Sequence, residues 1–378
     1  MGTDVDALLT RVAAHGLPAD RADQADPAGP RVAGDAAGPL DDDTFGALLA
    51  AARRERLVGL LAAATADGAL VVTDTQRAEL HRAHREAMLA CLALERLALA
   101  VHDGLAAAGV RHAFLKGVAW CHTHYPDPAW RAFGDVDVLV DPDGWDAAVA
   151  WCEARGARRH YPEPRPGFDR RFGRSVAWTF PDGLELDLHR TLAPGPLGQT
   201  IRPGEALDHL GAFPLGDRSL PRLEAALECV HAALHATLGD PVPRLTALRD
   251  VAQFVLVTRP APAAVEAWCR RFRVGAAVRA GLLGAARRLG LGPAPLLHWA
   301  ATYVPGPTED RYFKATVAAG GSYARQALAT LPAVPGVRAK VAYALALAAP
   351  RRAYLDGDER GRLGRLRRVG GVLTGGGR

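Results

Sequence analysis

Cysteine is scarce in this chain of 378 residues, which has five cysteines and no CxxC pair. An odd number of scattered cysteines argues against a disulfide framework and favours a reducing compartment. Long hydrophobic runs are also missing, because stretches such as Val341–Ala349 fall far short of the roughly 20 residues needed to span a bilayer. The N-terminus lacks the positive region and apolar stretch of a signal peptide. We therefore expect a cytoplasmic protein with no membrane partner.

A basic surface is lacking over most of the chain, although the formal net charge is +5. Residues 351–378 carry eight arginines against three acidic residues, which leaves 38 basic and 38 acidic residues elsewhere. Binding of nucleic acid needs a basic face, so the neutral body argues against a nucleic-acid partner. Lysine is rare as well, with only three in a background rich in arginine. One of them, Lys116, lies close to the most informative motif of the chain.

Composition and periodicity divide the chain into five segments. Residues 1–40 and 351–378 are predicted to be flexible, the second of them as a basic, disordered tail. Helical patterns over 41–109 predict a helical lead-in. An α/β module is predicted at 110–200. Helical segments punctuated by Pro and Gly over 201–350 predict an all-helical C-terminal domain.

The α/β module is marked by short runs of β-branched residues and leucine, bounded by Gly and Pro. Strands are predicted at 110–115, 136–140, 175–180 and 184–189, with a short helix over 118–124. Pro181-Asp182-Gly183 separates the last two strands. Asp-Gly between two alternating segments is a strong hairpin signal, so these strands are expected to pair with each other.

Two aspartates stand at the start of the second predicted strand. Because side chains alternate along a strand, Asp135 and Asp137 point to one face while the valines beside them point to the core. Carboxylates about 6–7 Å apart along a strand can turn their oxygens towards one point. At about 4 Å they would repel each other by roughly 4 kcal/mol, and a cation such as magnesium would turn this repulsion into attraction. Many Asp-x-Asp pairs are merely solvated, so the motif alone leaves both interpretations open.

A third carboxylate lies in the predicted hairpin. In its second strand the leucines form one face, and Glu185, Asp187 and His189 form the other. If this strand pairs beside residues 136–140, Asp187 faces the same cleft as the first two aspartates. Three converging carboxylates are what a two-metal phosphoryl transfer needs, with one ion for the attacking oxygen and one for the leaving phosphate.

Two neighbouring features favour a phosphate site. Lys116-Gly117 lies at the predicted strand-to-helix turn, where backbone N–H groups, the helix N-terminus and one cation can hold a triphosphate. Arg131 lies four residues before Asp135 and could clamp phosphate oxygens bidentately. A strand-end lysine in solvent is the alternative for Lys116.

A separate set of metal-binding residue types occurs on the helix predicted near 220–238. His231 and His235 have the i, i+4 spacing of metal ligands, and Glu224 and Glu228 lie on the same flank. The HExxH form is absent, so a ladder of Glu and His contacts on a helix surface is the alternative. A metal-dependent hydrolase built on the two histidines would contain zinc and would be indifferent to the Asp-x-Asp motif.

In their order along the chain, these motifs resemble a known family. They are Phe114-Leu-Lys-Gly117, Tyr125-Pro-Asp-Pro, Arg131-Ala-Phe-Gly-Asp-Val-Asp-Val-Leu-Val140 and Leu184-Glu-Leu-Asp-Leu-His189. Over about residues 41–260 the chain resembles the uncharacterised nucleotidyltransferase family of the polymerase-β-like superfamily. This resemblance implies an α+β fold, in which a small mixed β-sheet core lies between a helical N-terminal lead-in and an all-helical C-terminal domain. Lys116-Gly117 stands where the wider superfamily has a Gly-Ser or Gly-Gly turn.

The resemblance also implies roles for individual residues. The metal ligands and catalytic residues would be Asp135, Asp137 and Asp187, with Asp187 as the base for an acceptor hydroxyl. The nucleotide would be bound by Lys116, Gly117, Arg131 and Gly134. The acceptor side of the cleft would be lined by His189, His231, His235 and Asp250. For His231, His235 and Asp250 the alternative is that they tie the two domains together.

The implied reaction is a magnesium-dependent transfer of a nucleoside monophosphate, with AMP from ATP as the expected case. An acceptor hydroxyl attacks the α-phosphate and pyrophosphate leaves, while two Mg²⁺ ions neutralise charge at both ends. The expected partners are a nucleoside triphosphate and a small-molecule or peptide/protein acceptor. The alternative is a non-catalytic accessory protein that keeps the nucleotidyltransferase fold, and the presence of all three aspartates counts against it.

Overall fold

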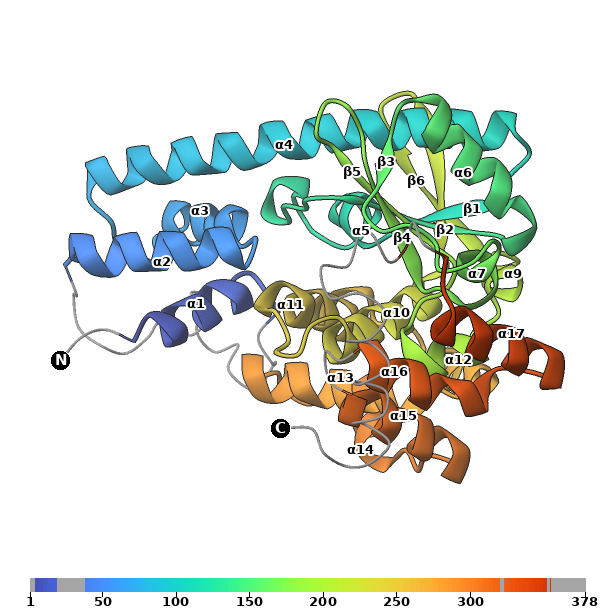
Figure 1. Ribbon diagram of the computed structural model, residues 1–378. Helices are drawn as coiled ribbons and strands as arrows, with labels where there is room; N and C mark the ends of the chain where they lie inside the picture. The colour runs from blue at the N-terminus through green and yellow to red at the C-terminus, as the bar shows by residue number, and fades with distance from the viewer. Residues whose placement is uncertain (1–3, 19–37, 320–322, 352–353, 355–378) are drawn as a thin grey trace.

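A mixed seven-stranded β-sheet forms the centre of the protein in a computed structural model that describes residues 4–18, 38–319, 323–351 and 354 (Figure 1). The strands lie in the order β3-β4-β5-β2-β1-β7-β6. They are β1 (His112–Leu115), β2 (Val136–Val140), β3 (Arg158–Arg159), β4 (Ser175–Thr179), β5 (Glu185–His189), β6 (Leu210–Leu215) and β7 (Arg218–Leu223). β2 pairs antiparallel with β1 and parallel with β5. The predicted α+β class is confirmed.

Helices precede, interrupt and follow the sheet. Before it lie α1 (Val5–Ala14), α2 (Asp42–Arg54), α3 (Val58–Ala66) and α4 (Asp74–Ala107). Between its strands lie α5 (Lys116–Thr123), α6 (Trp145–Ala154), α7 (Phe168–Phe172), α8 (Gly195–Thr200) and α9 (Pro203–Ala206). After it lie α10 (Ala225–Leu238), α11 (Leu245–Gln253), α12 (Pro262–Phe272), α13 (Gly275–Leu289), α14 (Pro295–Thr302), α15 (Pro307–Ala319), α16 (Tyr323–Thr330) and α17 (Val337–Ala348). A π-helical turn at Phe254–Thr258 extends α11.

The 34-residue helix α4 spans the molecule and connects the N-terminal helices to the sheet (Figure 1). A capping box starts it, because the side chains of Thr73 and Gln76 each accept a hydrogen bond from the other's backbone N–H. One part of α4 packs on α2 and α3, and another contacts β2, α5 and α6. Helices α10 to α16 gather on the far side of the molecule from α4 (Figure 1). In the part of the chain that is described, no helix is both long and apolar enough to cross a membrane.

The predicted hairpin and its place in the sheet agree with the structure. β4 and β5 pair antiparallel, and the turn between them contains Gly183 with φ 84°, in the left-handed region that favours glycine. β5 then pairs with β2, so the strand that carries Asp187 lies directly beside the strand that carries Asp137. This neighbourhood is the condition on which the predicted carboxylate cluster depends.

The prediction of an all-helical segment after residue 201 was wrong for β6 and β7. These two strands form an antiparallel hairpin around Gly216-Asp217 and extend the sheet beyond β1. Phe213, Leu215 and Leu220 are buried, which is the alternation expected of a strand pair with one covered face. Prolines at positions 214 and 221 interrupt this pattern in the sequence, since proline usually argues against a strand.

The prediction of a flexible segment over residues 1–40 was wrong for α1. Asp4 caps this helix by accepting a hydrogen bond from the backbone N–H of Asp6. Its apolar face is buried, and Arg249 from α11 donates to the backbone oxygen of Ala13 at 2.8 Å. Residues 19–37 of that segment, and all of the predicted tail except residues 351 and 354, lie outside the described residues.

A buried ion pair joins the segment before β2 to α11. Arg131 donates from Nε and Nη2 to the two oxygens of Asp250, each at 2.7 Å, and the Tyr125 hydroxyl donates to Asp250 Oδ1 at 2.8 Å. Arg131 is 6% exposed and Asp250 is 1% exposed, so water screens this pair very little. The contact fixes the helical part of the chain against the segment that leads into the central strand β2.

Loss of Asp250 should therefore destabilise the fold strongly. Asp250→Ala leaves the Arg131 guanidinium buried without a counter-ion, which is expected to lower the free energy of unfolding by about 3–5 kcal/mol in guanidinium denaturation. Asp240→Ala is the matched control, because the Asp240–Arg244 pair lies 3.0 Å apart with side chains 40% and 45% exposed. That loss should stay below about 1 kcal/mol. Similar losses in both variants would contradict this account.

Candidate active site

The register of β2 and β5 brings carboxylates together. Asp137 and Asp187 are directly paired in this parallel ladder, and residues opposite each other point to the same face of a sheet. Asp135 immediately precedes β2. Asp135 and Asp137 both line the cavity described below, and the charge of Asp137, followed by burial, raises the pKa of Asp135. The structure thus brings together the three aspartates that the sequence singled out.

Asp137 is the most buried of the three, with 3% of the residue exposed. Its Oδ1 lies 2.6 Å from Lys116 Nζ and 2.7 Å from His189 Nε2. Burial opposes ionisation, but the lysine charge and the histidine contact outweigh it and hold the pKa of Asp137 well below its usual range. These contacts therefore favour the ionised form of this buried carboxylate.

His189 lies between two carboxylates. Its Nε2 is also 3.1 Å from Asp187 Oδ2. Burial favours the neutral imidazole, yet the charge of Asp187 and the contact with Asp137 raise the pKa of His189 above its usual value. His189, which was predicted to line the acceptor side, is fully buried in contact with both carboxylates and is not among the residues that line the cavity described below.

One group of side chains at this site can hold a metal ion. Ligand atoms of Asp137, Asp187 and His189 all lie within 4.8 Å of one another. Asp187 Oδ1 is buried and has no hydrogen-bond partner. A buried carboxylate oxygen without a donor is costly, so it offers a favourable position for a cation.

Lys116 reaches Asp137 from a strained turn. β1 ends at Leu115 and α5 begins at Lys116, whose φ of 43° lies in the left-handed region that residues with a Cβ rarely adopt. The following residue must be glycine, because a Cβ at Gly117 would lie 2.8 Å from the Cβ of Phe133. From this turn the ammonium group of Lys116 reaches the Asp137 carboxylate.

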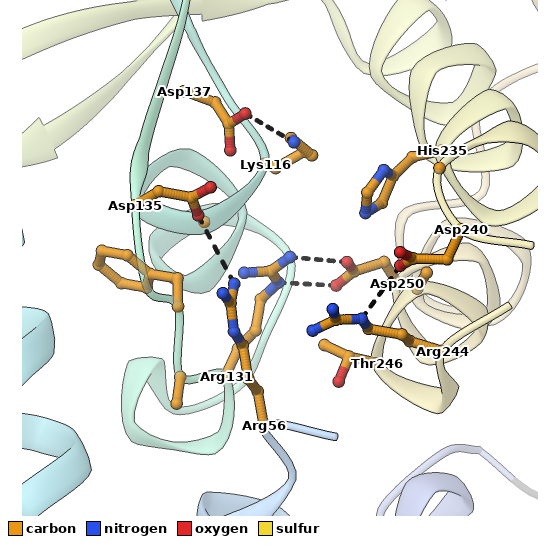
Figure 2. A pocket seen from close by; sticks show the side chains of 15 residues that line it. Arg56, Lys116, Arg131, Asp135, Asp137, His235, Asp240, Arg244, Thr246 and Asp250 are labelled. Carbon is orange, nitrogen blue, oxygen red and sulfur yellow. Dashed lines mark hydrogen bonds and ion pairs between the residues drawn. The ribbon is translucent and has the colours of Figure 1, made fainter. Parts of the chain in front are cut away.

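A cavity of about 180 Å³ opens beside the start of β2 (Figure 2). One wall comes from the β1–α5 turn and the segment before β2, and the facing wall comes from the end of α10 and the start of α11 (Figure 2). Within the described chain, the cations that line it are Arg56, Lys116, Arg131 and Arg244. The aspartates that line it are Asp135, Asp137, Asp240 and Asp250. Asp187, beside Asp137 on the neighbouring strand β5, is not part of the lining.

Two residues predicted to bind nucleotide have other contacts. Arg131, which was predicted to clamp phosphate, lines the cavity, but two donors of its fork, Nε and Nη2, are bonded to Asp250. Gly134 lies under another arginine, since a Cβ there would be 2.6 Å from Arg56 Nη2. Glycine at this position therefore leaves space for the Arg56 guanidinium.

The two histidines of α10 lie in different surroundings. His235 lines the cavity, whereas His231 is buried edge-to-face against Trp120 with ring centroids 5.6 Å apart. Burial, followed by the charge of Lys116, lowers the pKa of both histidines far below the usual value. Among the residues that the structure describes, neither belongs to a group of three metal-ligand side chains. A zinc site on this helix thus lacks a third ligand there.

Sequence reasoning missed the residues that complete the cavity. Arg56, from the loop between α2 and α3, places Nη1 3.5 Å from Asp135 Oδ1. Asp240, Arg244 and Thr246 come from the loop between α10 and α11 and the start of α11. No motif links these positions to the Asp-x-Asp strand. The one local signal is Arg56 itself, an arginine just after a helix at a position where glycine is usual.

The chain was compared with solved structures, with curated proteins and with protein-family models. The crystal structure of an antigenic nucleotidyltransferase-like protein from Paracoccidioides brasiliensis is 14% identical, and the match covers 50% of this chain and 92% of that chain with a TM-score of 0.30. No curated protein matches the chain. The model of the uncharacterised nucleotidyltransferase family matches residues 41–290, which include α2 to α4, the whole sheet and α10 to α13. The chain therefore belongs to the uncharacterised nucleotidyltransferase family.

Proposed function

We propose that the protein is a magnesium-dependent nucleotidyltransferase that transfers a nucleoside monophosphate, AMP from ATP in the expected case, to an acceptor hydroxyl. The observation that carries this proposal is the direct pairing of Asp137 and Asp187 on adjacent parallel strands, with Asp135 beside them. Lys116 Nζ lies 2.6 Å from Asp137 at the turn that begins α5. Membership of the family supports the reaction class.

The carboxylates fit a hard divalent cation. Asp187 Oδ1 is buried without a partner, and Asp137 and Asp187 offer ligand atoms within 4.8 Å of each other. Carboxylate oxygens suit Mg²⁺, especially when phosphate oxygens complete its shell. Asp135, Asp137 and Asp187 would hold the metal, which when bound would stabilise negative charge on the attacking and leaving oxygens.

Different side chains of the site would bind the phosphates and transfer the proton. Lys116 and the first N–H groups of α5 would bind the triphosphate. The acceptor oxygen forms a bond to the α-phosphorus while the bond to the bridging oxygen breaks in line, and pyrophosphate leaves with the electron pair. Asp187 would accept the hydroxyl proton, held in orientation by His189 Nε2 at 3.1 Å from its Oδ2.

The acceptor would contact the helical wall of the cavity. His235 is neutral there because burial lowers its pKa far below the usual value, and Thr246 and Arg244 lie on the same wall (Figure 2). These groups can donate and accept hydrogen bonds without competing for the metal. A small-molecule or peptide/protein hydroxyl fits this surface better than a polymeric nucleic acid, which needs an extended basic face.

A non-catalytic accessory protein with the same fold is the second candidate, and one observation favours it. Lys116, His189 and Arg56 already lie within 2.6 Å, 3.1 Å and 3.5 Å of the three carboxylates. The negative charges are thus compensated by the chain itself. Such a protein would show neither a magnesium-dependent gain in stability nor release of pyrophosphate.

Magnesium alone should raise the melting temperature of the wild type. A ligand that binds only the folded state stabilises it, by about 2.7 kcal/mol when its concentration is about 100 times Kd. Differential scanning fluorimetry should show the shift for the wild type and for Asp240→Asn, which alters a carboxylate on the other wall of the cavity. Asp137→Asn/Asp187→Asn should abolish it. A shift that survives in this double variant would place the metal elsewhere.

Turnover should depend on the Asp-x-Asp pair. With ATP or GTP, Mg²⁺ and a panel of acceptors, the wild type should release pyrophosphate in a coupled assay. Asp135→Asn and Asp137→Asn should each lower kcat by at least about 100-fold, because each removes charge that holds the metal. Unchanged kcat in Asp137→Asn would overturn the mechanism. If calorimetry showed no binding of either nucleotide with Mg²⁺ to the wild type, the accessory protein would be the better account.

A further inference from the structure

Arg56 occupies a backbone position that usually belongs to glycine. It follows α2, and its φ is 56°. Its N–H donates to Arg53 O at 3.2 Å, while Leu57 N–H donates to Ala52 O at 2.8 Å. These two bonds form the Schellman end of a helix, whose left-handed residue is glycine in most proteins. A side chain with a Cβ is strained there, so the local chain does not favour arginine.

The ion pair of Arg56 does not compensate for this strain. Its Nη1 lies 3.5 Å from Asp135 Oδ1, and the two side chains are 40% and 33% exposed. Ion pairs that are this exposed contribute little to stability, because water screens them and holding long side chains costs entropy. Folding therefore gains little from arginine at position 56.

The surroundings nevertheless hold Arg56 at the cavity. The neighbouring Glu55 accepts a hydrogen bond from Leu245 N–H at 2.8 Å through its side chain, and one from the Thr246 hydroxyl through its backbone oxygen. These bonds tie the end of α2 to the start of α11, on the far wall of the cavity. On the near wall, Gly134 leaves space for the guanidinium, because a Cβ there would lie 2.6 Å from Arg56 Nη2.

Arg56 and Lys116 place two cations at different depths in one cavity. Each pairs with one carboxylate of the Asp-x-Asp motif, Arg56 with Asp135 and Lys116 with Asp137 (Figure 2). The Lys116 side chain is 11% exposed and that of Arg56 is 40% exposed, so the arginine lies nearer the solvent. A triphosphate is an extended anion that one lysine cannot cover, and a guanidinium binds phosphate oxygens bidentately.

We propose that Arg56 is a phosphate-binding residue, whose guanidinium exchanges Asp135 for the β- and γ-phosphates of a nucleoside triphosphate. This inference rests on the proposed function. Arg131 cannot take the same role through its fork, because its Nε and Nη2 are bonded to Asp250. The long, exposed contact with Asp135 is weak enough to exchange. The strained turn keeps the guanidinium beside the carboxylates that would hold the metal.

Arg56→Gly separates binding from stability, because glycine suits the backbone at this position. Arg273→Gly is the matched control. Arg273 ends α12 with φ 54°, donates from its N–H to Arg270 O at 3.4 Å, and precedes Val274, which donates to Cys269 O at 3.0 Å. It is thus a second arginine in the same kind of helix end, it is exposed, and it does not line the cavity. Neither variant should lower the melting temperature.

Calorimetric titrations with Mg²⁺–ATP, Mg²⁺–tripolyphosphate and AMP test the role directly. Charge-assisted hydrogen bonds predict that Arg56→Gly weakens binding of the first two ligands by about 10- to 100-fold. AMP, which lacks the β- and γ-phosphates, should bind Arg56→Gly and the wild type equally. Arg273→Gly should bind all three ligands as the wild type does. Gly134→Ala should weaken triphosphate binding as well, because its Cβ displaces the Arg56 guanidinium.

The outcomes distinguish this inference from the proposed function. Equal affinity of wild type and Arg56→Gly for Mg²⁺–ATP would overturn the role of Arg56 and leave the nucleotidyltransferase intact. Tripolyphosphate binding that depends on Arg56, without binding of Mg²⁺–ATP or Mg²⁺–GTP, would support the phosphate site and overturn the proposed reaction. If the wild type bound neither tripolyphosphate nor a nucleotide, both would fail.

Discussion

Mutual repulsion among three carboxylates is the constraint on which the candidate site depends. Direct pairing of β2 with β5 places Asp137 beside Asp187, and Asp135 enters the same region one residue before the strand. Charges this close, and largely removed from water, require cations. The chain supplies two cations, Lys116 from the turn after β1 and Arg56 from the loop after α2, and His189 at the end of β5 contacts two of the carboxylates.

The cations Arg56 and Lys116 both have a strained backbone with positive φ. Among the described residues, the non-glycine residues with positive φ are Arg56, Lys116, Arg259 and Arg273. The first two line the cavity and contact the Asp-x-Asp motif. Strain of this kind persists only where the surroundings hold it, and it concentrates at sites that bind ligands. Under the proposed function, carboxylates beside exchangeable cations would bind a metal-bound polyphosphate.

The helical part of the chain contributes to the site as well as enclosing it. The buried contact of Asp250 with Arg131 and Tyr125 fixes α11 against the segment before β2, and bonds from the start of α11 to Glu55 fix the loop after α2. The carboxylates and the facing helical wall are thus held at a defined separation. Since the two walls come from distant parts of the sequence, the shape of the cavity depends on how these parts pack.

The sequence by itself determined the local chemistry of this protein. Alternation along a strand predicted that Asp135 and Asp137 share one face, and Asp-Gly predicted the hairpin, because both effects depend only on neighbouring residues. Both aspartates line the cavity. β6 and β7 escaped prediction because prolines interrupt their alternation. The tertiary structure decided which charges meet. An arginine fork fits any carboxylate or phosphate, so the residues near Arg131 in the sequence could not show that Asp250 binds its guanidinium. For the same reason the sequence could not show that Arg56 contacts Asp135. Those pairings follow from the packing of α2 and α11 beside the sheet, which only long-range contacts define.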